Sequence, residues 1–396
     1  MSRPLRILSL ATLFPSPARR RFGLFVARQA QALARRGDVD MVVVHPVGLA
    51  PQPFDRFINS PAERALRASG HEWGVEVHYP RFRTIPRFGV RWNPALIARA
   101  VLPLARRLHA RAPFDVIDAQ FFYPDGPAAA RIAAALGLPL SIKARGSDIH
   151  LWGDRPFARR QMLAAARQAG GLLAVSAALK ADMAALGMEQ EKIAVHYTGL
   201  NGALFHPHPR AEARRAVADI AAADGPLLVS VGNLIALKGQ HLAIEALAGV
   251  PAARLVVAGK GPEEATLRAL AARLGLADRV HFAGSVPPRR LALLLSAADA
   301  MVLPSEREGL ANAWVEALAC GTPLVITDVG GAREVVRDAV AGRLVARDAG
   351  AIAEAIAAVL AAPSAQTDVA AQAAAFSWEA NAAQLSAHFH RLAKRD

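Results

Sequence analysis

A chain of 396 residues is too long for one ordinary core, and its 53% hydrophobic and 20% charged residues are typical of a folded protein rather than a disordered one. The single cysteine, Cys320, excludes an internal disulfide framework and any multi-cysteine metal site, which favours a reducing compartment. The formal net charge is +14, and all of the excess lies in residues 1–200, with 28 Lys+Arg against 14 Asp+Glu, while residues 201–396 hold 19 of each. The first half is therefore expected to meet an anionic partner: a lipid surface, a phosphorylated acceptor or a nucleic acid.

The first residues imitate a secretion signal, because Arg3 and Arg6 precede a short apolar patch. This patch is followed by Pro15, Pro17 and an arginine run without a small-residue cleavage site, so we interpret it as a first buried strand. No apolar run approaches the ~20 residues that a helix needs to span a bilayer. We therefore expect a cytoplasmic protein.

Apolar strands alternate with Ala- and Leu-rich amphipathic helices along the first half, which is the pattern of a parallel α/β sheet covered on both faces. The strands are expected at 6–12, 39–46, 114–120, 139–144 and 171–176, with helices such as 25–37 and 127–137 between them. Residues 51–93 break this pattern with Pro, aromatic and Arg residues, so we expect a long surface excursion there.

The same pattern restarts at about residue 225, after a Pro- and His-rich stretch. Its strands are expected at 226–232, 253–259, 279–284, 300–304, 323–327 and 342–345. We therefore predict two doubly wound, Rossmann-like domains, over 1–205 and 206–375, and a terminal helix over 376–396 that could cross back to the first domain. Ligands of such sheets bind beyond the carboxyl ends of the strands, so we expect a site in the cleft between the domains.

Two carboxylates eight positions apart, Glu308 and Glu316, stand in an otherwise apolar stretch, EGLANAWVEALACGTPLVITDVGG. Glu308 is expected in the loop after the strand 300–304, and Glu316 one to two turns into a helix that continues to about Cys320. The amides of residues 309–313 would form the start of this helix, which suits phosphate or sugar oxygens. The two carboxylates suit the hydroxyls of a ribose and of a sugar ring. Spacing alone equally allows two solvated carboxylates.

Two further loops that follow strands add candidates. Lys238, in VGNLIALKG, stands where a cation can reach a diphosphate. Gly259 and Gly261, in AGKGPEEATL, occupy a strand-to-helix turn where a nucleobase or a ribose could pack close to the backbone. Glycine-rich turns after strands are common, so each signal is weak by itself.

Together and in this order, these motifs resemble the donor-binding domain of the retaining glycosyltransferases of family 4, which have two facing Rossmann-like domains (the GT-B fold). The resemblance covers nearly the whole chain. It further rests on GSVPPRRLALLLSAADAMVLPSEREGL and CGTPLVITDVGGAREVV in the second half, and on FGLFVARQAQALARRG and ARGSD in the first.

The resemblance implies a role for each candidate. Glu316 would bind the ribose hydroxyls of a nucleotide-sugar donor, Glu308 a hydroxyl of the transferred sugar, and Lys238 the diphosphate, while the Gly23 loop would close over the phosphates from the first domain. The implied donor-binding set is Gly23, Asn233, Lys238, Gly259, Gly261, Glu308, Gly309, Leu310, Ala311, Asn312, Ala313 and Glu316. Lys238 and the helix start would stabilise the leaving diphosphate without a metal or other cofactor. We find no covalent nucleophile and expect front-face attack, with retention implied only by the resemblance.

Two positions depart from the family pattern. Asn233 stands where many members have Arg, so a fixed positive charge at the diphosphate is lost. Arg145, in KARGSD, stands where many have His, and arginine cannot act as a general base. We expect Arg145, with Glu308 and Lys238, in the catalytic set, touching a donor phosphate or an anionic acceptor and oriented by Asp148. Simple pairing of Arg145 with Asp148 is the alternative.

Other motifs favour plainer interpretations. Asp38 and Asp40 spell DxD, but they precede a strand, away from the edge where ligands bind, which favours a surface turn over a metal site. The twelve histidines show no metal-ligand spacing, and both HPH at 206–208 and HFH at 388–390 are expected on the surface. Cys320 is expected to be inert packing at a helix end.

The basic first half interleaves charge with aromatic residues. Arg19, Arg20 and Arg21 precede the Gly23 loop, and RFRTIPRFGVRW (81–92) alternates four arginines with Phe82, Phe88 and Trp92. This pattern favours docking on an anionic membrane without spanning it. A solvated basic loop packed by its own aromatic residues stays open, and nucleic acid is disfavoured.

These observations predict a glycosyltransferase that moves a hexosyl unit from a nucleotide-diphosphate sugar to a saccharide or polyprenyl-linked saccharide acceptor. The expected setting is exopolysaccharide, cell-wall polymer or lipopolysaccharide assembly at the inner face of the cytoplasmic membrane. The alternatives are a nucleotide-sugar 2-epimerase of the same architecture and a non-catalytic nucleotide-sugar binding protein. The nucleotide base, the sugar and the acceptor are not specified by the motifs.

Overall fold

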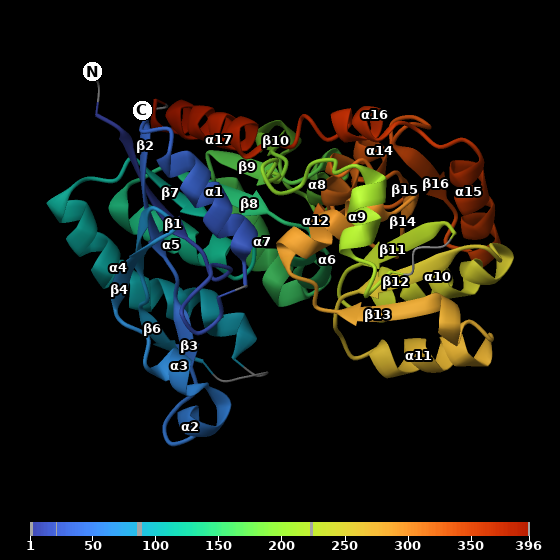
Figure 1. Cartoon of the computed structure of the whole chain (residues 1–396). Helices are drawn as coiled ribbons and strands as arrows, with labels where there is room; N and C mark the ends of the chain where they lie inside the picture. The colour runs from blue at the N-terminus through green and yellow to red at the C-terminus, as the bar shows by residue number, and fades with distance from the viewer. Residues whose placement is uncertain (1–2, 21, 85–88, 222–224, 395–396) are drawn as a thin grey trace. The chain divides into compact units, whose positions relative to one another are not determined.

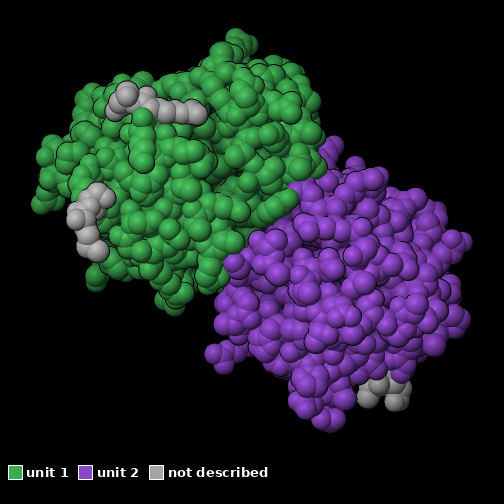
Figure 2. Space-filling model, turned by 90° about the horizontal axis from the view of Figure 1, so that it is seen from above, with its two compact units in different colours: residues 1–199, 378–396 green, residues 200–377 purple. Residues whose placement is uncertain are grey.

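The computed structural model describes residues 3–20, 22–84, 89–221 and 225–394. The chain forms two compact units, unit 1 with residues 1–199 and 378–396 and unit 2 with residues 200–377 (Figures 1 and 2). Each unit is built around its own largely parallel sheet. No helix within the described residues is both long and apolar enough to cross a membrane.

Unit 1 contains an eight-stranded sheet of order β10-β9-β8-β7-β1-β2-β5-β4. Its strands are β1 (Leu5–Leu10), β2 (Val39–Val44), β4 (Ser69–Glu72), β5 (Val75–His78), β7 (Val116–Ala119), β8 (Leu140–Ala144), β9 (Gly171–Ala174) and β10 (Ile193–Val195). Its helices are α1 (Leu24–Ala34), α2 (Asp55–Ile58), α3 (Pro61–Arg64), α4 (Asn93–Arg111), α5 (Asp125–Leu136), α6 (Ser147–Trp152), α7 (Pro156–Gln168), α8 (Ala177–Ala185) and α17 (Trp378–Ala393).

Helices cover both faces of this sheet, which explains why its central strands are mostly apolar and almost entirely buried. Successive side chains of β1 point to opposite faces, so Ile7 joins the core beneath α1 and α17, whereas Leu8 and Leu10 join the core beneath α4, α5 and α7. The five strands predicted for this half are all confirmed.

The predicted surface excursion is wrong for residues 69–78. β5 pairs in parallel with β2, and β4 pairs antiparallel with β5, so this stretch extends the main sheet. Only the valines of β5 are fully buried, since the strand alternates buried and exposed residues. Such a short half-buried strand lacks the apolar run by which the central strands are recognised. β3 (Val47–Leu49) and β6 (Arg81–Arg83) form a separate two-stranded parallel sheet, and Figure 1 shows α2 and α3 projecting beyond it.

Unit 2 contains a six-stranded, fully parallel sheet of order β13-β12-β11-β14-β15-β16. Its strands are β11 (Leu227–Val231), β12 (Arg254–Ala258), β13 (Val280–Gly284), β14 (Ala300–Leu303), β15 (Leu324–Thr327) and β16 (Gly342–Val345). Its helices are α9 (Arg210–Ala216), α10 (Gln240–Ala246), α11 (Glu264–Arg273), α12 (Pro288–Ala297), α13 (Asn312–Ala319), α14 (Ala332–Val335), α15 (Ala349–Ala361) and α16 (Gln366–Ala371). All six predicted strands are confirmed.

Local sequence sets several helix ends. α8 follows Ser176, whose hydroxyl accepts a hydrogen bond from the Leu179 amide at 3.0 Å, and α15 follows Asp348, whose carboxylate accepts one from the Ala351 amide at 3.0 Å. α5 ends at Gly137, which adopts the left-handed conformation with φ 67°. These caps satisfy amides and carbonyls that would otherwise be left unpaired at the helix ends.

The last helix packs on unit 1, where α17 lies against α1. The expectation that His388 is on the surface is wrong, because its residue is only 5% exposed and its Nε2 lies 3.1 Å from the Ser141 hydroxyl. Gly171 makes room for this ring, since a Cβ there would lie 2.5 Å from His388. The histidine is therefore part of the packing between the C-terminal helix and the sheet.

Candidate functional site

The sheet of unit 2 changes direction at its centre. After β11 the chain first adds β12 and β13 on one side, and then β14, β15 and β16 on the other. Ligands of open α/β sheets bind at such a switch point, outside the carboxyl ends of the strands. The loop after β11 carries Asn233 and Lys238, and the loop after β14 carries Glu308. The switch point therefore brings together candidates that lie 70 residues apart.

Lys238 and Glu308 form an ion pair at this edge. Lys238 closes a short 3-10 helix (Ala236–Lys238), and its Nζ donates to Glu308 Oε1. The Ser305 hydroxyl donates to the same oxygen at 2.8 Å. The side chains of Lys238 and Glu308 are only 20% and 10% exposed, so the pair is largely desolvated. A hydrogen-bonded pair in this setting is stronger and better oriented than a surface ion pair.

Backbone contacts hold the Glu308 loop in place. The Glu306 amide donates to the Leu237 carbonyl at 2.8 Å, and the Gly331 amide donates to the Gly309 carbonyl at 2.8 Å. The Thr327 hydroxyl also donates to the Ser305 carbonyl. The loop is thus tied to the turn that carries Lys238 and to the turn after β15. Glu308 is consequently presented by a loop that has hydrogen-bond partners on two neighbouring turns.

Gly259 and Gly261 are needed for contacts between loops. Gly259 has φ 155°, and a Cβ there would lie 1.8 Å from the Gly232 carbonyl oxygen; a Cβ at Gly261 would lie 2.2 Å from the Leu234 carbonyl oxygen. The loops after β11 and β12 run side by side, because the Leu234 amide donates to the Lys260 carbonyl at 3.0 Å. The close approach of the two loops therefore by itself explains why glycine stands at both positions, with or without a ligand.

The remaining donor-site candidates cluster at the start of α13. The helix begins at Asn312, after Ala311, which has no side chain that could cap the first amides. Leu310 and Ala311 are buried, Asn312 is exposed, and Glu316 is half-buried in the second turn. The side chain of Asn233 is exposed, while its carbonyl accepts from Gln240 Nε2 at 3.1 Å. Cys320 ends this helix and is buried, and burial raises the pKa of its thiol to about 12.

In unit 1, Gly23 and Arg145 also lie beyond the sheet's carboxyl edge. Gly23 precedes α1 with φ 71°, and a Cβ there would lie 2.1 Å from the Leu13 carbonyl oxygen, so no other residue fits. Arg145 follows β8, and its guanidinium donates from Nε to the Gln120 carbonyl at 3.0 Å and from Nη2 to Gln120 Oε1. Asp148 accepts instead from the backbone amides of Arg145 and Phe122.

A buried polar network beneath this edge was not anticipated from the sequence. Gln29 Nε2 donates to Gln120 Oε1 at 3.1 Å, and Lys143 Nζ lies 3.2 Å from Gln29 Oε1 and 2.7 Å from His196 Nδ1. Gln120 Nε2 and the Ser9 hydroxyl both donate to Asp118 Oδ2. These residues come from five separate segments, so no local motif could reveal them. The one signal available was a lysine inside an apolar strand, in LSIKA.

Burial shifts the proton affinities in this network. It lowers the pKa of the Lys143 ammonium and of the His196 imidazole well below their usual values, and it raises the pKa of the Asp118 carboxyl. It also lowers the pKa of the Arg145 guanidinium to about 10. Asp125, which accepts from the Thr12 amide at 3.0 Å and from its hydroxyl at 2.7 Å, has its pKa raised to about 7, mainly by burial.

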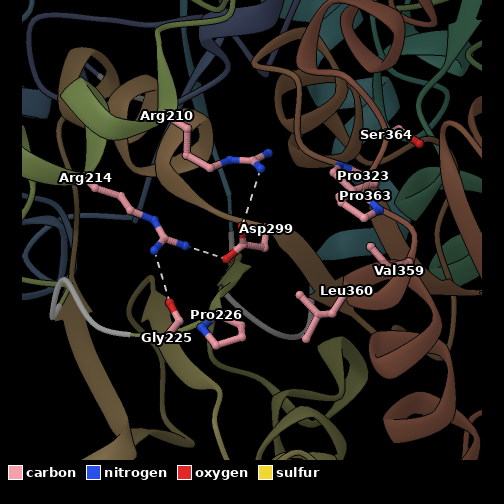
Figure 3. A pocket seen from close by; sticks show the side chains of 10 residues that line it. All are labelled: Arg210, Arg214, Gly225, Pro226, Asp299, Pro323, Val359, Leu360, Pro363 and Ser364. Carbon is pink, nitrogen blue, oxygen red and sulfur yellow. Dashed lines mark hydrogen bonds and ion pairs between the residues drawn. The ribbon is translucent and has the colours of Figure 1, made fainter.

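Two pockets differ in their position relative to the strands. A cavity of about 370 Å³ in unit 2 is lined by Arg210, Arg214 and Asp299 together with apolar residues (Figure 3). Its lining residues Pro226, Asp299 and Pro323 all precede strands, so it opens at the amino edge of the sheet and is separate from the donor-site candidates. A cavity of about 150 Å³ in unit 1 is lined by residues that follow β1 and β2, including Thr12, Arg19 and His45, and so lies at the carboxyl edge.

The DxD residues lie at the amino ends of strands and have protein partners. Asp38 accepts from the Ser386 hydroxyl at 2.7 Å and from Arg36 Nη2 at 2.9 Å, while Asp40 pairs with Arg6 at 3.1 Å. Over the described part of the chain, no group of three or more possible His, Cys, Asp or Glu metal ligands occurs.

Two family models match the chain, Glycosyltransferase Family 4 over residues 23–203 and Glycosyl transferases group 1 over residues 214–376. A D-inositol 3-phosphate glycosyltransferase of Acidothermus cellulolyticus is 40% identical over 184 residues, which are 42% of this chain and 41% of that protein. The chain thus spans less than half of the length of that relative. A putative teichuronic acid biosynthesis glycosyltransferase of Bacillus subtilis, TuaC, is 28% identical over 338 residues, 83% of this chain and 82% of that protein.

Solved structures agree with the architecture. HepE from Anabaena in complex with UDP matches with a TM-score of 0.75 at 22% identity, over 98% of this chain and 100% of that chain. Sucrose-phosphate synthase from Thermosynechococcus elongatus matches with a TM-score of 0.77 at 22% identity, over 98% of this chain and 99% of that chain. At such identities the likeness concerns the fold.

Two Rossmann-like units of this kind form the GT-B fold, which confirms the predicted fold class. The chain belongs to the group 1 glycosyltransferases of family 4, as both family models indicate, and the resemblance inferred from the motifs is confirmed.

Proposed function

We propose that this glycosyltransferase moves a hexosyl unit from a nucleotide-diphosphate sugar to a saccharide or lipid-linked saccharide, with retention of configuration. The observation that carries the proposal is the Lys238–Glu308 pair at the switch point of unit 2. A desolvated cation beside a carboxylate is suited to a donor that presents both a diphosphate and sugar hydroxyls.

The proposed chemistry uses the chain's own residues and no metal. Lys238 and the uncapped amides at the start of α13 stabilise the negative charge that builds up on the departing diphosphate. Glu308 holds a hydroxyl of the transferred sugar and Glu316 the ribose. The acceptor attacks from the face that the diphosphate leaves, and a phosphate oxygen takes the acceptor's proton. This route requires no side-chain nucleophile.

Uracil is the base to test first. HepE, whose fold this chain shares, has been solved with UDP and with UDP-glucose. The TuaC relative is described as acting in teichuronic acid biosynthesis, which supports a cell-envelope polymer as the setting proposed here. If the acceptor is carried by a lipid at the inner face of the cytoplasmic membrane, the positive charge of the first half would attract the protein to this anionic surface.

The surface of unit 1 supports this membrane contact. Phe54, Phe57 and Ile58, at α2, are 60%, 75% and 53% exposed, and Arg56 stacks on Phe57 at 4.9 Å. Trp92 is 48% exposed, with Arg91 stacked on it at 4.1 Å. Large apolar side chains beside arginines are the groups that enter the headgroup region of an anionic bilayer. Arg21, Arg87 and Phe88, which also prompted the hypothesis, lie outside the described residues.

Co-sedimentation with vesicles tests the membrane contact. We expect binding to vesicles that contain phosphatidylglycerol and weak binding to neutral phosphatidylcholine vesicles. Phe57→Ser should bind the anionic vesicles about 10- to 150-fold more weakly, since burying one such side chain contributes about 1.5–3 kcal/mol. Leu274→Ser is the matched control, because Leu274 is an exposed apolar residue of unit 2. Equal binding to both vesicle types would remove the membrane from the proposal.

Calorimetric titration with UDP, GDP and ADP tests the donor site. We expect selective binding of one nucleotide, weakened by about 1–3 kcal/mol in Glu316→Ala because a charge-assisted hydrogen bond to the ribose is lost. Glu354→Ala, which removes an exposed carboxylate on α15, is the control and should bind as the wild type does. Binding of no nucleotide, or of all three without any effect of Glu316→Ala, would contradict the proposed donor site.

Product analysis separates transfer from the two alternatives. Consumption of a nucleotide sugar without an acceptor, yielding its epimer, would favour a 2-epimerase. Tight nucleotide-sugar binding with neither hydrolysis nor transfer would favour a binding protein. We expect release of the nucleotide diphosphate to be accelerated by a saccharide acceptor, as a transferase requires.

A further inference from the structure

The guanidinium of Arg145 is turned into unit 1. Its Nε and Nη2 donate to the backbone and side chain of Gln120, and its plane lies over the ring of Phe25 at 4.7 Å. The third nitrogen, Nη1, is buried and has no hydrogen-bond partner among the described residues. Contacts within unit 1 therefore hold the guanidinium at Nε, at Nη2 and over its face.

Both side-chain contacts of Arg145 lead to the same helix. Phe25 and Gln29 are four residues apart and so share one face of α1 in its first two turns. Gln120 Oε1 accepts from Gln29 Nε2 at 3.1 Å and also from Arg145 Nη2. Arg145 consequently touches α1 directly through Phe25 and indirectly, through Gln120, at Gln29.

The start of α1 has no side-chain cap, and Val26 and Ala27 bury its first turn in the core. Its first residue follows Gly23, which offers no side chain to cap the helix, and Phe25 itself is only half-buried. Gln29, by contrast, is 1% exposed and its Oε1 lies 3.2 Å from Lys143 Nζ. A buried polar side chain whose donor and acceptor atoms are both hydrogen-bonded fixes the position of a helix more specifically than apolar packing alone.

We propose that Arg145 is a positioning residue. Together with Gln120 and Gln29 it holds the first two turns of α1 in place. It thereby also holds the Gly23 loop, which leads into α1, at the carboxyl edge of the sheet. This role replaces the direct ligand contact expected from the sequence. It rests on the proposed function in one respect, namely that the Gly23 loop contacts the donor phosphates. The contacts of Arg145 with Phe25 and Gln120 are independent of the proposed function.

Amide hydrogen exchange on the full chain without substrate tests the positioning. Gln29→Leu keeps Arg145, its bonds to Gln120 and its contact with Phe25, but removes the buried hydrogen bonds from Gln29 to Gln120 and Lys143. We expect peptides covering residues 12–20 and the first turn of α1 to exchange about tenfold faster, the change that loss of one buried hydrogen bond produces. Arg145→Met should have the same effect. Arg131→Met, which removes an exposed arginine of α5, is the matched control and should leave this exchange unchanged.

Steady-state kinetics on the same variants supply a readout that a general loss of packing would not give. We expect Gln29→Leu and Arg145→Met to raise the KM for the donor by about tenfold while the KM for the acceptor stays the same. Unchanged exchange at residues 12–20 together with a strong loss of transfer in Arg145→Met would overturn the proposal and return Arg145 to direct ligand contact. Unchanged exchange and kinetics in Gln29→Leu would overturn it too.

The two hypotheses can fail separately. If Arg145→Met does not fold, as judged by circular dichroism, Gln29→Leu still decides the question because its substitution preserves volume and leaves Arg145 in place. If the wild type binds no nucleotide, the proposed function fails, while faster exchange in Gln29→Leu would still support the positioning of α1.

Discussion

The loops at the carboxyl edge of the sheet are held by different interactions in unit 1 and in unit 2. In unit 2 the loops are joined by backbone: the Gly232 amide donates to the Ala258 carbonyl, the Leu234 amide to Lys260, and the Gly259 amide to Gly284. In unit 1 the corresponding edge lies on buried side chains, among them Gln29, Gln120 and Lys143. Backbone hydrogen bonds also join the loops at the edge of unit 1, for example from the Gln120 amide to the Leu10 carbonyl, so the buried polar network is what distinguishes that edge.

This difference explains why the two halves of the site were not equally visible in the sequence. Close backbone approach requires glycine at particular positions of a loop, so it leaves short motifs such as AGKGP. A side-chain network is built from residues far apart in the chain, each of which looks ordinary in its own segment. Burial of ionisable groups also makes the second kind of edge sensitive to pH, whereas backbone hydrogen bonds are not.

We expect the largest effect in unit 2, from removing the positive charge of Lys238 at the carboxyl edge of the sheet. Lys238→Met should lower kcat about 10²–10³-fold, the usual result of deleting one preorganised group that stabilises developing charge. Initial rates of transfer at saturating donor are the measurement. Lys192→Met is the control, since Lys192 forms an ion pair with Glu189 on unit 1. A variant with the wild-type rate would show that Lys238 only orders Glu308.

The buried ionisable side chains at the carboxyl edge of unit 1 should make the free energy of unfolding depend on pH. The pKa of Asp125 is raised from 3.8 to about 7, so the folded state binds a proton that the unfolded state releases. This group therefore stabilises the fold most below about pH 4, and its contribution is lost as the pH rises to about 7, by at most about 4 kcal/mol. Unfolding by urea from pH 4 to 8, for the wild type and Asp125→Asn, measures it.

Comparison with Asp125→Asn isolates this carboxyl, because Asp118 and Asp148, whose pKa values are also raised by burial, stay in the variant. The wild type should lose stability relative to Asp125→Asn as the pH rises. A difference between the two proteins that is the same at every pH would mean that Asp125 is ionised throughout, and the contrast between the edges would lose its electrostatic part.

The smallest of these effects tests how closely the loops of unit 2 approach one another. Gly259→Ala should lower the free energy of unfolding by about 3 kcal/mol, since its Cβ would meet a carbonyl oxygen and its φ is unfavourable for alanine. Gly37→Ala is the matched control: Gly37 also has a positive φ, 77°, but a Cβ there meets nothing within 4 Å, so we expect a loss of about 1 kcal/mol. Equal losses would mean that conformation alone accounts for both glycines.

The sequence by itself determined the fold class, every central strand and the position of Glu308 and Lys238 in loops after strands, because apolar periodicity and glycine turns are local properties of the chain. Only the tertiary structure decided that β4 and β5 extend the first sheet, that His388 is buried against Ser141, and that the Arg145 guanidinium contacts Gln120 and Phe25. These features depend on which distant segments pack together. Burial, and with it the charge state and the partners of a polar side chain, is settled by that packing and not by the neighbours of a residue in sequence.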